Sequence, residues 1–403
     1  MPEQARSGPL SHVRVLDLGR IMAAPWATQI LADLGADVIK IERPGAGDDT
    51  RAWGPPFLKD ADGRPTHEAG YFLSVNRGKR SVTVDIATAE GQAVVRALAG
   101  TADVVVENFK VGALAKYGLD AATLRAARPS LICCSVTGFG QDGPRADQAA
   151  YDFAIQAMGG LMSVTGERDD RPGGGPQKVG VPVVDLMTGM YAAVAILAAL
   201  ARRAETGEGE TIDLAMLDVA AALLANQAMN HLVSGRVPRR GGNQHPNIQP
   251  QDVFGCADGA FVLAVGNDGQ FAKLCAVLGK PEWTTDARFN ANAARVAHNA
   301  ELTALLRDCF ATWTREAIVG ALDAAGVPAA PINTINQVFA DPQLVHRGML
   351  QHLPHPLGGT VPQVVSPIRL HDAPLRFDRA PPLLGQHTAE VLRELGLGTG
   401  GTA

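Results

Sequence analysis

The sequence predicts an α/β protein in which a large domain with a doubly wound, mainly parallel sheet is joined to a smaller α+β domain. Over the first 215 residues, short apolar runs of strand character alternate with amphipathic helical segments. This alternation is typical of parallel βαβ units with helices on both faces of the sheet. After about Arg236 the chain becomes rich in turn residues, which indicates a second domain. A length of 403 residues accommodates two or three domains.

The elements of the large domain follow from short apolar runs bounded by turns. The expected strands are 13–18, 37–41, 81–85, 103–107 and 131–135, and the expected helices are 26–34, 89–98 and 186–201. Cys133 and Cys134 are neighbours in one of these strands, so their side chains should point to opposite faces of the sheet.

The second domain is predicted from a hairpin followed by helices. Asp258-Gly259 lies between two runs of strand character, a strong signal for a β-hairpin. Helices are expected at 268–278, 297–311 and 315–325. From Val327 the chain is rich in proline and short strands, with one closing helix at 388–395. The predicted boundaries are 1–225 for the large domain, 226–330 for the small one and 331–403 for a C-terminal segment.

Charge and motif content exclude several classes of protein. A net charge of −5 argues against a general nucleic-acid binder, which normally has a basic face. The loop Gly19-Arg20-Ile21-Met22-Ala23-Ala24-Pro25 lacks the G-x-G-x-x-G spacing, and there is no P-loop or G-x-S-x-G motif, so no nicotinamide, flavin or serine-hydrolase chemistry is predicted. His352 and His355 flank Pro354 in an expected loop, which does not predict a metal site.

The cysteines and the N-terminus predict a cytoplasmic protein. Five cysteines form an odd set without a C-x-x-C pair, as expected of small core residues in a reducing compartment. The first ten residues contain no apolar core of a secretory signal. The apolar stretch 186–201 approaches the length of a membrane span, but its alanine content and the aspartate before it favour a core helix and no membrane contact.

Asp185 is the most informative residue. It stands at the head of an uncharged stretch, 186–201, predicted to be a buried helix of about 24 Å at about 1.5 Å per residue. Burial raises the pKa of a carboxyl group, whereas the N–H groups of a first helical turn stabilise its anion. We expect these N–H groups to keep Asp185 ionised and to serve as oxyanion donors. Position alone leaves two interpretations open, a helix N-cap and a nucleophile.

Basic and amide side chains gather beside the predicted strands. Arg43 and Asn108 follow the strands ending near residues 41 and 107, and Lys79 precedes another on an expected loop. Ligands of open α/β sheets bind outside the carboxyl ends of the strands. Together these side chains predict a clamp for a cofactor that carries several phosphates.

The chain resembles the class III CoA-transferases of the CaiB/BaiF type, which include formyl-CoA transferase. The resemblance runs in order through nearly the whole chain, over residues 35–44, 76–85, 106–109, 156–166, 266–271, 327–339 and 381–388. It implies an interlocked homodimer in which the C-terminal segment returns to the large domain. It also implies small-molecule partners only, an acyl-CoA and a carboxylic acid.

The resemblance assigns roles to individual residues. It identifies Asp185 as the catalytic aspartate, which would form an aspartyl–acyl anhydride and an aspartyl-CoA thioester. It implies CoA contacts from Arg20, Ile21, Met22, Arg43, Lys79, Asn108, Phe109 and Lys116. Tyr151, Gln156 and Arg240 are candidates for the substrate pocket, and Arg239 and Arg240 could meet a second carboxylate of the substrate.

Two departures from related branches narrow the activity. The racemase branch has a histidine where this chain has Tyr151, so the alternative of an acyl-CoA racemase or epimerase lacks one of its two bases. The formyl-CoA transferase branch has a glycine-rich lid where this chain has the less glycine-rich stretch 240–246. The stretch from Val327 on is closer to the succinyl-CoA-dependent dicarboxylate transferases. A non-catalytic CoA-binding protein is the other alternative.

Overall fold

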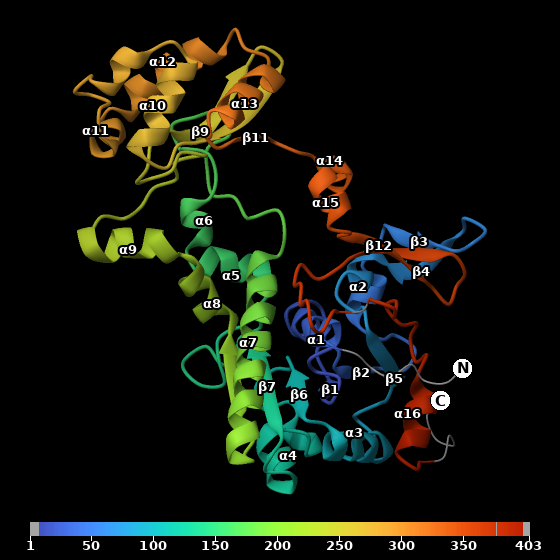
Figure 1. The fold of residues 1–403 in the computed structure, drawn as a ribbon. Helices are drawn as coiled ribbons and strands as arrows, with labels where there is room; N and C mark the ends of the chain where they lie inside the picture. The colour runs from blue at the N-terminus through green and yellow to red at the C-terminus, as the bar shows by residue number, and fades with distance from the viewer. Residues whose placement is uncertain (1–7, 376, 398–403) are drawn as a thin grey trace. The chain divides into compact units, whose positions relative to one another are not determined.

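The computed structural model of the chain describes residues 8–375 and 377–397, and it contains two compact units. The first unit comprises the residues up to Leu161, Val179–Ala228 and the residues from Pro342 on. The second unit comprises Met162–Lys178 and Met229–Asp341. Each unit has a core of its own and is described separately below, with the element labels of Figure 1.

The first unit is built on a six-stranded parallel sheet. Its strands are β1 (Arg14–Asp17), β2 (Asp37–Glu42), β5 (Lys79–Thr83), β6 (Val104–Glu107), β7 (Ile132–Thr137) and β8 (Thr211–Ala215), in the spatial order β5-β2-β1-β6-β7-β8. Chain order therefore runs outward in both directions from the pair β1 and β6. This arrangement creates a topological switch point, the place where open parallel sheets bind ligands.

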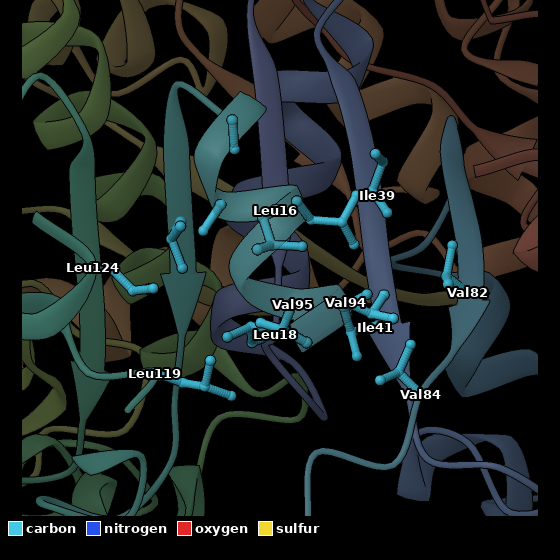
Figure 2. Packing of buried hydrophobic residues seen from close by; sticks show 14 of the residues in the cluster. Leu16, Leu18, Ile39, Ile41, Val82, Val84, Val94, Val95, Leu119 and Leu124 are labelled. Atoms are coloured by element: carbon cyan, nitrogen blue, oxygen red, sulfur yellow. The ribbon is translucent and has the colours of Figure 1, made fainter. Parts of the chain in front are cut away.

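Helices cover both faces of this sheet, which confirms the predicted doubly wound arrangement. On one face, α3 (Ala89–Thr101), α4 (Ala121–Ala127) and α16 (Thr388–Glu394) enclose a core with the strands, and Figure 2 shows Val94 and Val95 of α3 beside Leu18 and Ile41. On the other face, α1 (Ala23–Asp33) and α7 (Val183–Thr206) do the same. Cys133 belongs to the first core and Cys134 to the second, as predicted.

Helix α7 is longer than predicted and buries only one of its faces. It runs from Val183 to Thr206 and ends at Gly207, whose φ of 74° is left-handed. A Cβ atom at Gly189 would lie 2.6 Å from the carbonyl oxygen of Ala23, so glycine permits the close approach of α1. The opposite face exposes Met190, Tyr191 and Val194. Within this chain the prediction of a buried helix therefore holds for one face only, because an uncharged sequence does not show which face meets the core.

By length and composition, α7 could also cross a membrane, with a mean hydropathy of 2.0 over its most apolar window. Core helices of soluble proteins meet the same criterion. One face of α7 packs against α1 and the parallel sheet in this chain. This packing agrees with the predicted core role.

The rest of the first unit consists of short elements and the returning C-terminal segment. These elements are η1 (Asp49–Ala52), β3 (Phe57–Lys59), β4 (Pro65–Ala69), α2 (Gly70–Leu73), η2 (Ala115–Tyr117), α5 (Asp152–Met158), α8 (Met216–Leu223), α15 (Pro342–His346), β12 (Leu350–Pro354) and β13 (Thr360–Val364). Ion pairs fasten α16 to the edge strand β5, where Arg80 meets Glu390 at 2.9 Å and Glu394 at 2.5 Å. The segment 342–397 thus lies in the first unit.

The second unit is a small α+β assembly with an antiparallel sheet. It contains β9 (Gln251–Cys256), β10 (Gly259–Ala264), β11 (Ala329–Pro331), α10 (Asp268–Val277), η3 (Pro281–Thr284), α11 (Asn292–Ala297), α12 (Asn299–Phe310), α13 (Arg315–Ala324) and α14 (Ile335–Ala340). The sheet order is β11-β10-β9, and Gly259 pairs with Cys256 across the hairpin, which confirms the hairpin prediction. In its core, Phe310 packs edge to face against both Phe254 and Phe261.

The two units divide the chain differently from the predicted boundaries. The chain passes between them four times, at α6 (Leu161–Val164), after Lys178, at α9 (Ala225–Ser234) and after Asp341. The segment 162–178, expected in the large domain, clusters with the second unit. There Arg240 forms an ion pair with Asp169 and donates to the carbonyl oxygen of Ser163 at 3.4 Å. These contacts join residues about 70 positions apart in the chain, which local sequence patterns do not reveal.

Candidate active site

The loops that follow β1 and β6 meet at the switch point of the sheet. The side chain of Asn108 accepts a hydrogen bond from the Arg20 N–H and donates one to the Arg20 carbonyl oxygen, both at 2.8 Å. The Arg20 guanidinium lies 5.4 Å from the centre of the Phe109 ring. Three residues predicted to contact a cofactor are therefore brought together at the carboxyl ends of adjacent strands.

A pocket of about 170 Å³ opens beside these loops and contains Asp185. Its lining includes Arg20, Ile21, Met22, Asn108, Phe109, Tyr151 and Asp185. The structure thus gathers the predicted catalytic carboxylate, five predicted cofactor contacts and one predicted substrate contact around a single hollow.

A second pocket, of about 230 Å³, shares lining residues with the first. Arg20 and Phe109 line both pockets, and the second pocket adds Arg43 and Tyr117. Arg43 is exposed directly after β2, as predicted. Lys116 is exposed on η2, with its amino group 4.6 Å from the centre of the Tyr117 ring.

Asp185 is a half-buried carboxylate with a raised pKa. It is the third residue of α7, and Pro182 occupies the N-cap, so the N-cap interpretation is wrong. Burial, and after it the negative charge of Asp152, raises the pKa of Asp185 to about 7. The expectation that the helix N-terminus would keep this pKa low was therefore also wrong.

The carboxylate of Asp152, a residue of α5, binds the N–H groups at the N-terminus of α7. Asp185 does not have this capping role. The Asp152 carboxylate accepts hydrogen bonds from the N–H groups of Val184 at 2.8 Å and Asp185 at 3.2 Å. The N–H of Leu186 donates to the carbonyl oxygen of Pro182. Because these first-turn donors are engaged, the prediction that they act as oxyanion donors is not supported.

The three predicted substrate-pocket residues have different surroundings. Tyr151 is 61% exposed and lines the pocket with Asp185. Gln156 is fully buried, donates to Asp152 at 2.5 Å and accepts from the N–H of Val179, so it supports Asp152 behind the pocket. Arg240 belongs to the second unit and pairs there with Asp169, whereas Arg239 is exposed.

Lys79 is not available as a cofactor contact, which corrects the prediction. It begins strand β5 instead of lying on a loop, and its side chain has no exposed surface. Its ammonium group donates to Asp17 at 3.0 Å, Asn76 at 2.9 Å and the carbonyl oxygen of Pro25 at 2.9 Å. Lys79 pairs in register with Val38 near the amino end of β2, the sheet edge opposite to Arg43 and Asn108.

Two residues near Asp185, Asp152 and Tyr71, were missed by sequence reasoning. Asp152 is spaced i, i+4 from the predicted Gln156 on one helix, a signal for a side-chain pair that sequence reasoning could have used. Tyr71 comes from α2, far away in the chain, and no local pattern points to it. Burial, followed by the charges of Asp185 and Asp152, raises the pKa of Tyr71, which places its phenol in the electrostatic field of the site. Among the described residues, no group of three or more His, Cys, Asp or Glu side chains could hold a metal ion.

The neighbouring carboxylates of Asp185 and Asp152 lead to a prediction about the pH dependence of kcat/KM. As the predicted nucleophile, Asp185 would react only in its ionised form, so kcat/KM should fall about tenfold per pH unit below about pH 7. Asp152→Asn removes the neighbouring negative charge and should move this fall to lower pH, while the loss of that charge at the N-terminus of α7 should cost about 0.3–1 kcal/mol of stability. The pH profile of kcat/KM measures the first effect, and urea unfolding measures the second. Glu205→Gln, twenty residues further along α7 and about 30 Å away, is the control and should shift neither. An unmoved profile in Asp152→Asn would disconnect Asp152 from the titration.

A parallel sheet with a pocket at its switch point and a carboxylate of raised pKa in that pocket describes an α/β enzyme that binds a ligand beside a reactive acid. A family model described as CoA-transferase family III matches residues 10–388. The chain belongs to this family and is a CoA-transferase.

Similar proteins and structures have related names. The succinate–glutarate CoA-transferase of Agrobacterium fabrum is 52% identical over 390 residues, covering 97% of this chain and 96% of that protein. The succinyl-CoA:mesaconate CoA-transferase of Haloarcula hispanica is 41% identical, with 98% of each chain covered. A crystal structure of a CaiB/BaiF family protein from Brucella suis has a TM-score of 0.84 and 51% identity, covering 97% of this chain and all of that one.

Proposed function

We propose that this enzyme moves CoA from succinyl-CoA to a dicarboxylic acid such as glutarate, with Asp185 as the nucleophile. The names of similar proteins support the substrate class, since the relatives from Agrobacterium fabrum and Homo sapiens are named for succinate or succinyl-CoA and glutarate. The observation that carries the role of Asp185 is its place in one pocket with the loops after β1 and β6.

CoA would bind across the wall formed by Arg20 and Phe109. The cations Arg43 and Arg20 line the second pocket with the Tyr117 and Phe109 rings, a combination suited to the phosphates and adenine of the nucleotide. The first pocket, which contains Asp185, would receive the thioester end. Lys116 stands on η2 next to Tyr117 and could add charge to the nucleotide side.

The proposed reaction uses Asp185 twice as a carrier. A carboxylate oxygen attacks the carbonyl carbon of succinyl-CoA, the C–S bond breaks, and CoA thiolate leaves behind an aspartyl–succinyl anhydride. The thiolate attacks the aspartyl carbonyl carbon and releases succinate, which gives an aspartyl-CoA thioester. The acceptor carboxylate attacks that thioester and expels the thiolate. The thiolate then takes the acceptor acyl group from the new anhydride, so that free Asp185 is restored.

The surroundings of Asp185 suit this role. Partial burial limits the access of water, which would hydrolyse an anhydride. A pKa of about 7 leaves a substantial ionised fraction at neutral pH and makes that carboxylate more basic than an exposed aspartate.

A substrate screen tests the proposal. Succinyl-CoA is offered with a panel of mono- and dicarboxylic acids, and new CoA esters are identified by mass spectrometry. We expect glutaryl-CoA or a similar dicarboxylic ester, and a KM for succinyl-CoA that rises about tenfold in Arg43→Ala, which loses an exposed phosphate contact. Deuterium uptake at the α-carbon without an acceptor acid would instead indicate a racemase. CoA binding with no exchange across the panel would indicate a non-catalytic protein.

We also propose that the protein is a cytoplasmic, interlocked homodimer. Besides Met190 and Val194 on α7, the strongly exposed apolar side chains include Leu232 and Val233 on α9 and Ile335 on α14. Such apolar faces in one chain mark interaction surfaces. All five cysteines are free, as in a reducing compartment. Sedimentation analysis should give twice the chain mass of 42.2 kDa, and a monomer at micromolar concentration would refute the dimer.

A further inference from the structure

The loop after β1 has nearly all its backbone polar groups bound by side chains. We call residues 19–21 the first loop. The N–H of Gly19 donates to Asp17 at 2.9 Å, and its carbonyl oxygen accepts from the Lys40 ammonium at 2.7 Å. Asn108 binds both polar groups of Arg20, as described above. These contacts come from side chains on or after three strands of the sheet.

The first loop ends in an unusual backbone conformation. Ile21 has a φ of 71°, a left-handed region that β-branched residues rarely adopt. Such a conformation persists only where the surroundings enforce it. The N–H of Ile21 donates to both carboxylate oxygens of Asp48, each at 3.2 Å. Asp48 thus holds the strained end of the first loop.

Lys40 and Asp48, which hold the two ends of the loop, are themselves an ion pair. Their charged atoms are 2.9 Å apart, and neither side chain has exposed surface. Asp48 also accepts from the N–H and the hydroxyl of Thr50, at 3.0 and 2.8 Å. Burial opposes ionisation, but the charge and hydrogen bond of Lys40 hold the pKa of Asp48 well below its usual range. The pair therefore stays ionised at any pH at which the enzyme would work.

We infer that the buried Lys40–Asp48 ion pair is a positioning device for the CoA site. Lys40 fixes Gly19 at one end of the first loop, and Asp48 fixes Ile21 at the other. The ion pair thereby positions Arg20, which lines both pockets. Lys40 and Asp48 are also among the residues that line the pocket with Arg43. The inference rests on the proposed function, since it takes CoA as the ligand whose binding the first loop controls.

A second buried ion pair in the same unit provides a matched control. Arg77 and Asp33 form two hydrogen bonds, at 3.0 and 2.7 Å, and their side chains are nearly as buried as those of Lys40 and Asp48. Arg77 also contacts Gln363 and Val364 in the C-terminal segment. Neither Asp33 nor Arg77 lines either pocket. A merely structural role of a buried ion pair should therefore appear equally in both.

The experiment compares Asp48→Asn with Asp33→Asn in the full-length protein. Asparagine retains the cap of η1 through its side-chain oxygen but loses the charge and one of the two acceptors for Ile21. Hydrogen exchange at the amides of residues 19–21 reports on the loop, and calorimetric titration with free CoA reports on the site. We expect exchange at Ile21 to quicken at least tenfold and the Kd for CoA to rise at least tenfold in Asp48→Asn. Asp33→Asn should change neither, whatever it does to Tm.

The outcomes separate this inference from the proposed function. Faster exchange at Ile21 with unchanged CoA affinity would overturn the positioning role. Equal losses of CoA affinity in Asp48→Asn and Asp33→Asn would show that the Lys40–Asp48 ion pair only contributes to general stability. Fast exchange of the Ile21 amide in the wild-type enzyme would show that Asp48 does not hold the first loop. This measurement needs no variant, so it remains decisive even if Asp48→Asn does not fold. A wild-type enzyme with slow exchange that bound no CoA would refute the proposed function, and the positioning role would fall with it.

Discussion

Replacing Asp185 with alanine or asparagine is expected to lower kcat for CoA transfer by at least about 10⁴-fold, the scale of loss when a covalent nucleophile is removed. The affinity for free CoA should stay within about threefold, because the proposed phosphate contacts of the nucleotide are in the pocket with Arg43, which Asp185 does not line. Transfer is measured by mass spectrometry of the CoA esters, and binding by calorimetry. Asparagine preserves the shape of the side chain, and alanine guards against deamidation back to aspartate.

A trapping experiment complements this loss of activity. Hydroxylamine added during turnover should convert the aspartyl thioester or anhydride to a hydroxamate on the peptide that contains Asp185. The same treatment without succinyl-CoA is the control and should leave the peptide unmodified. Substantial transfer by a folded Asp185→Ala enzyme, or a hydroxamate on another residue, would contradict the nucleophile role.

The raised pKa of Asp185 also predicts a gain in stability when it is replaced. A folded-state pKa of about 7, above the unfolded value of 3.8, means that folding favours the neutral form. This stabilisation is present below about pH 4 and is lost as the pH rises through 7. One pKa unit corresponds to about 1.4 kcal/mol, so Asp185→Asn should be more stable than wild type at pH 8 by up to about 4 kcal/mol. At pH 4 the difference should largely disappear.

Lys79→Met is expected to lower the free energy of unfolding by about 3–5 kcal/mol, the cost of leaving a buried partner charge unpaired. The partner is Asp17, which has no exposed surface and lies 3.0 Å from the ammonium. Burial opposes ionisation of Asp17, yet the charges of Lys79 and Lys40 lower its pKa. Urea unfolding at pH 7 measures the effect. Adding Asp17→Asn should recover part of the loss, because no lone charge would then remain buried.

Lys116→Met is the matched control for Lys79→Met. Lys116 is exposed, so its loss should change the free energy of unfolding by less than about 0.5 kcal/mol. Its proposed place beside the nucleotide predicts instead a weaker affinity for CoA. If Lys79→Met were as stable as wild type but bound CoA poorly, the original prediction of Lys79 as a cofactor contact would be right and its structural role wrong.

The sequence alone predicted those parts of the fold that depend on local periodicity. Alternation of apolar runs with amphipathic segments predicted a doubly wound sheet, and the opposed faces of Cys133 and Cys134 followed from the two-residue period of a strand. The hairpin at Asp258-Gly259 followed from its turn chemistry. Strand β8 was not predicted, because its polar residues at Thr211 and Asp213 interrupt the apolar pattern.

The sequence predicted the type of residue at the site better than its surroundings. Arg20, Asn108 and Phe109 meet as expected, because the carboxyl ends of adjacent parallel strands share one edge of the sheet. Lys79 looked equally suitable, since adjacency to a strand does not say at which end of the sheet a side chain lies or how deeply it is buried. Its contact with Asp17 joins residues 62 positions apart.

The amino-acid sequence by itself determined the α/β class, the helix that carries Asp185 and the cations after the strands, because each depends on neighbours within a few residues. Only the tertiary structure decided that Asp152 binds the first N–H groups of α7 and that one apolar face of α7 is exposed in this chain. It also decided that the ion pair of Lys40 and Asp48 contacts both ends of the first loop. These features depend on which distant segments share a low-dielectric interior. Burial and the like charge of Asp152 set the pKa of Asp185, and the hydrogen bonds to the buried Asp48 hold the conformation of Ile21.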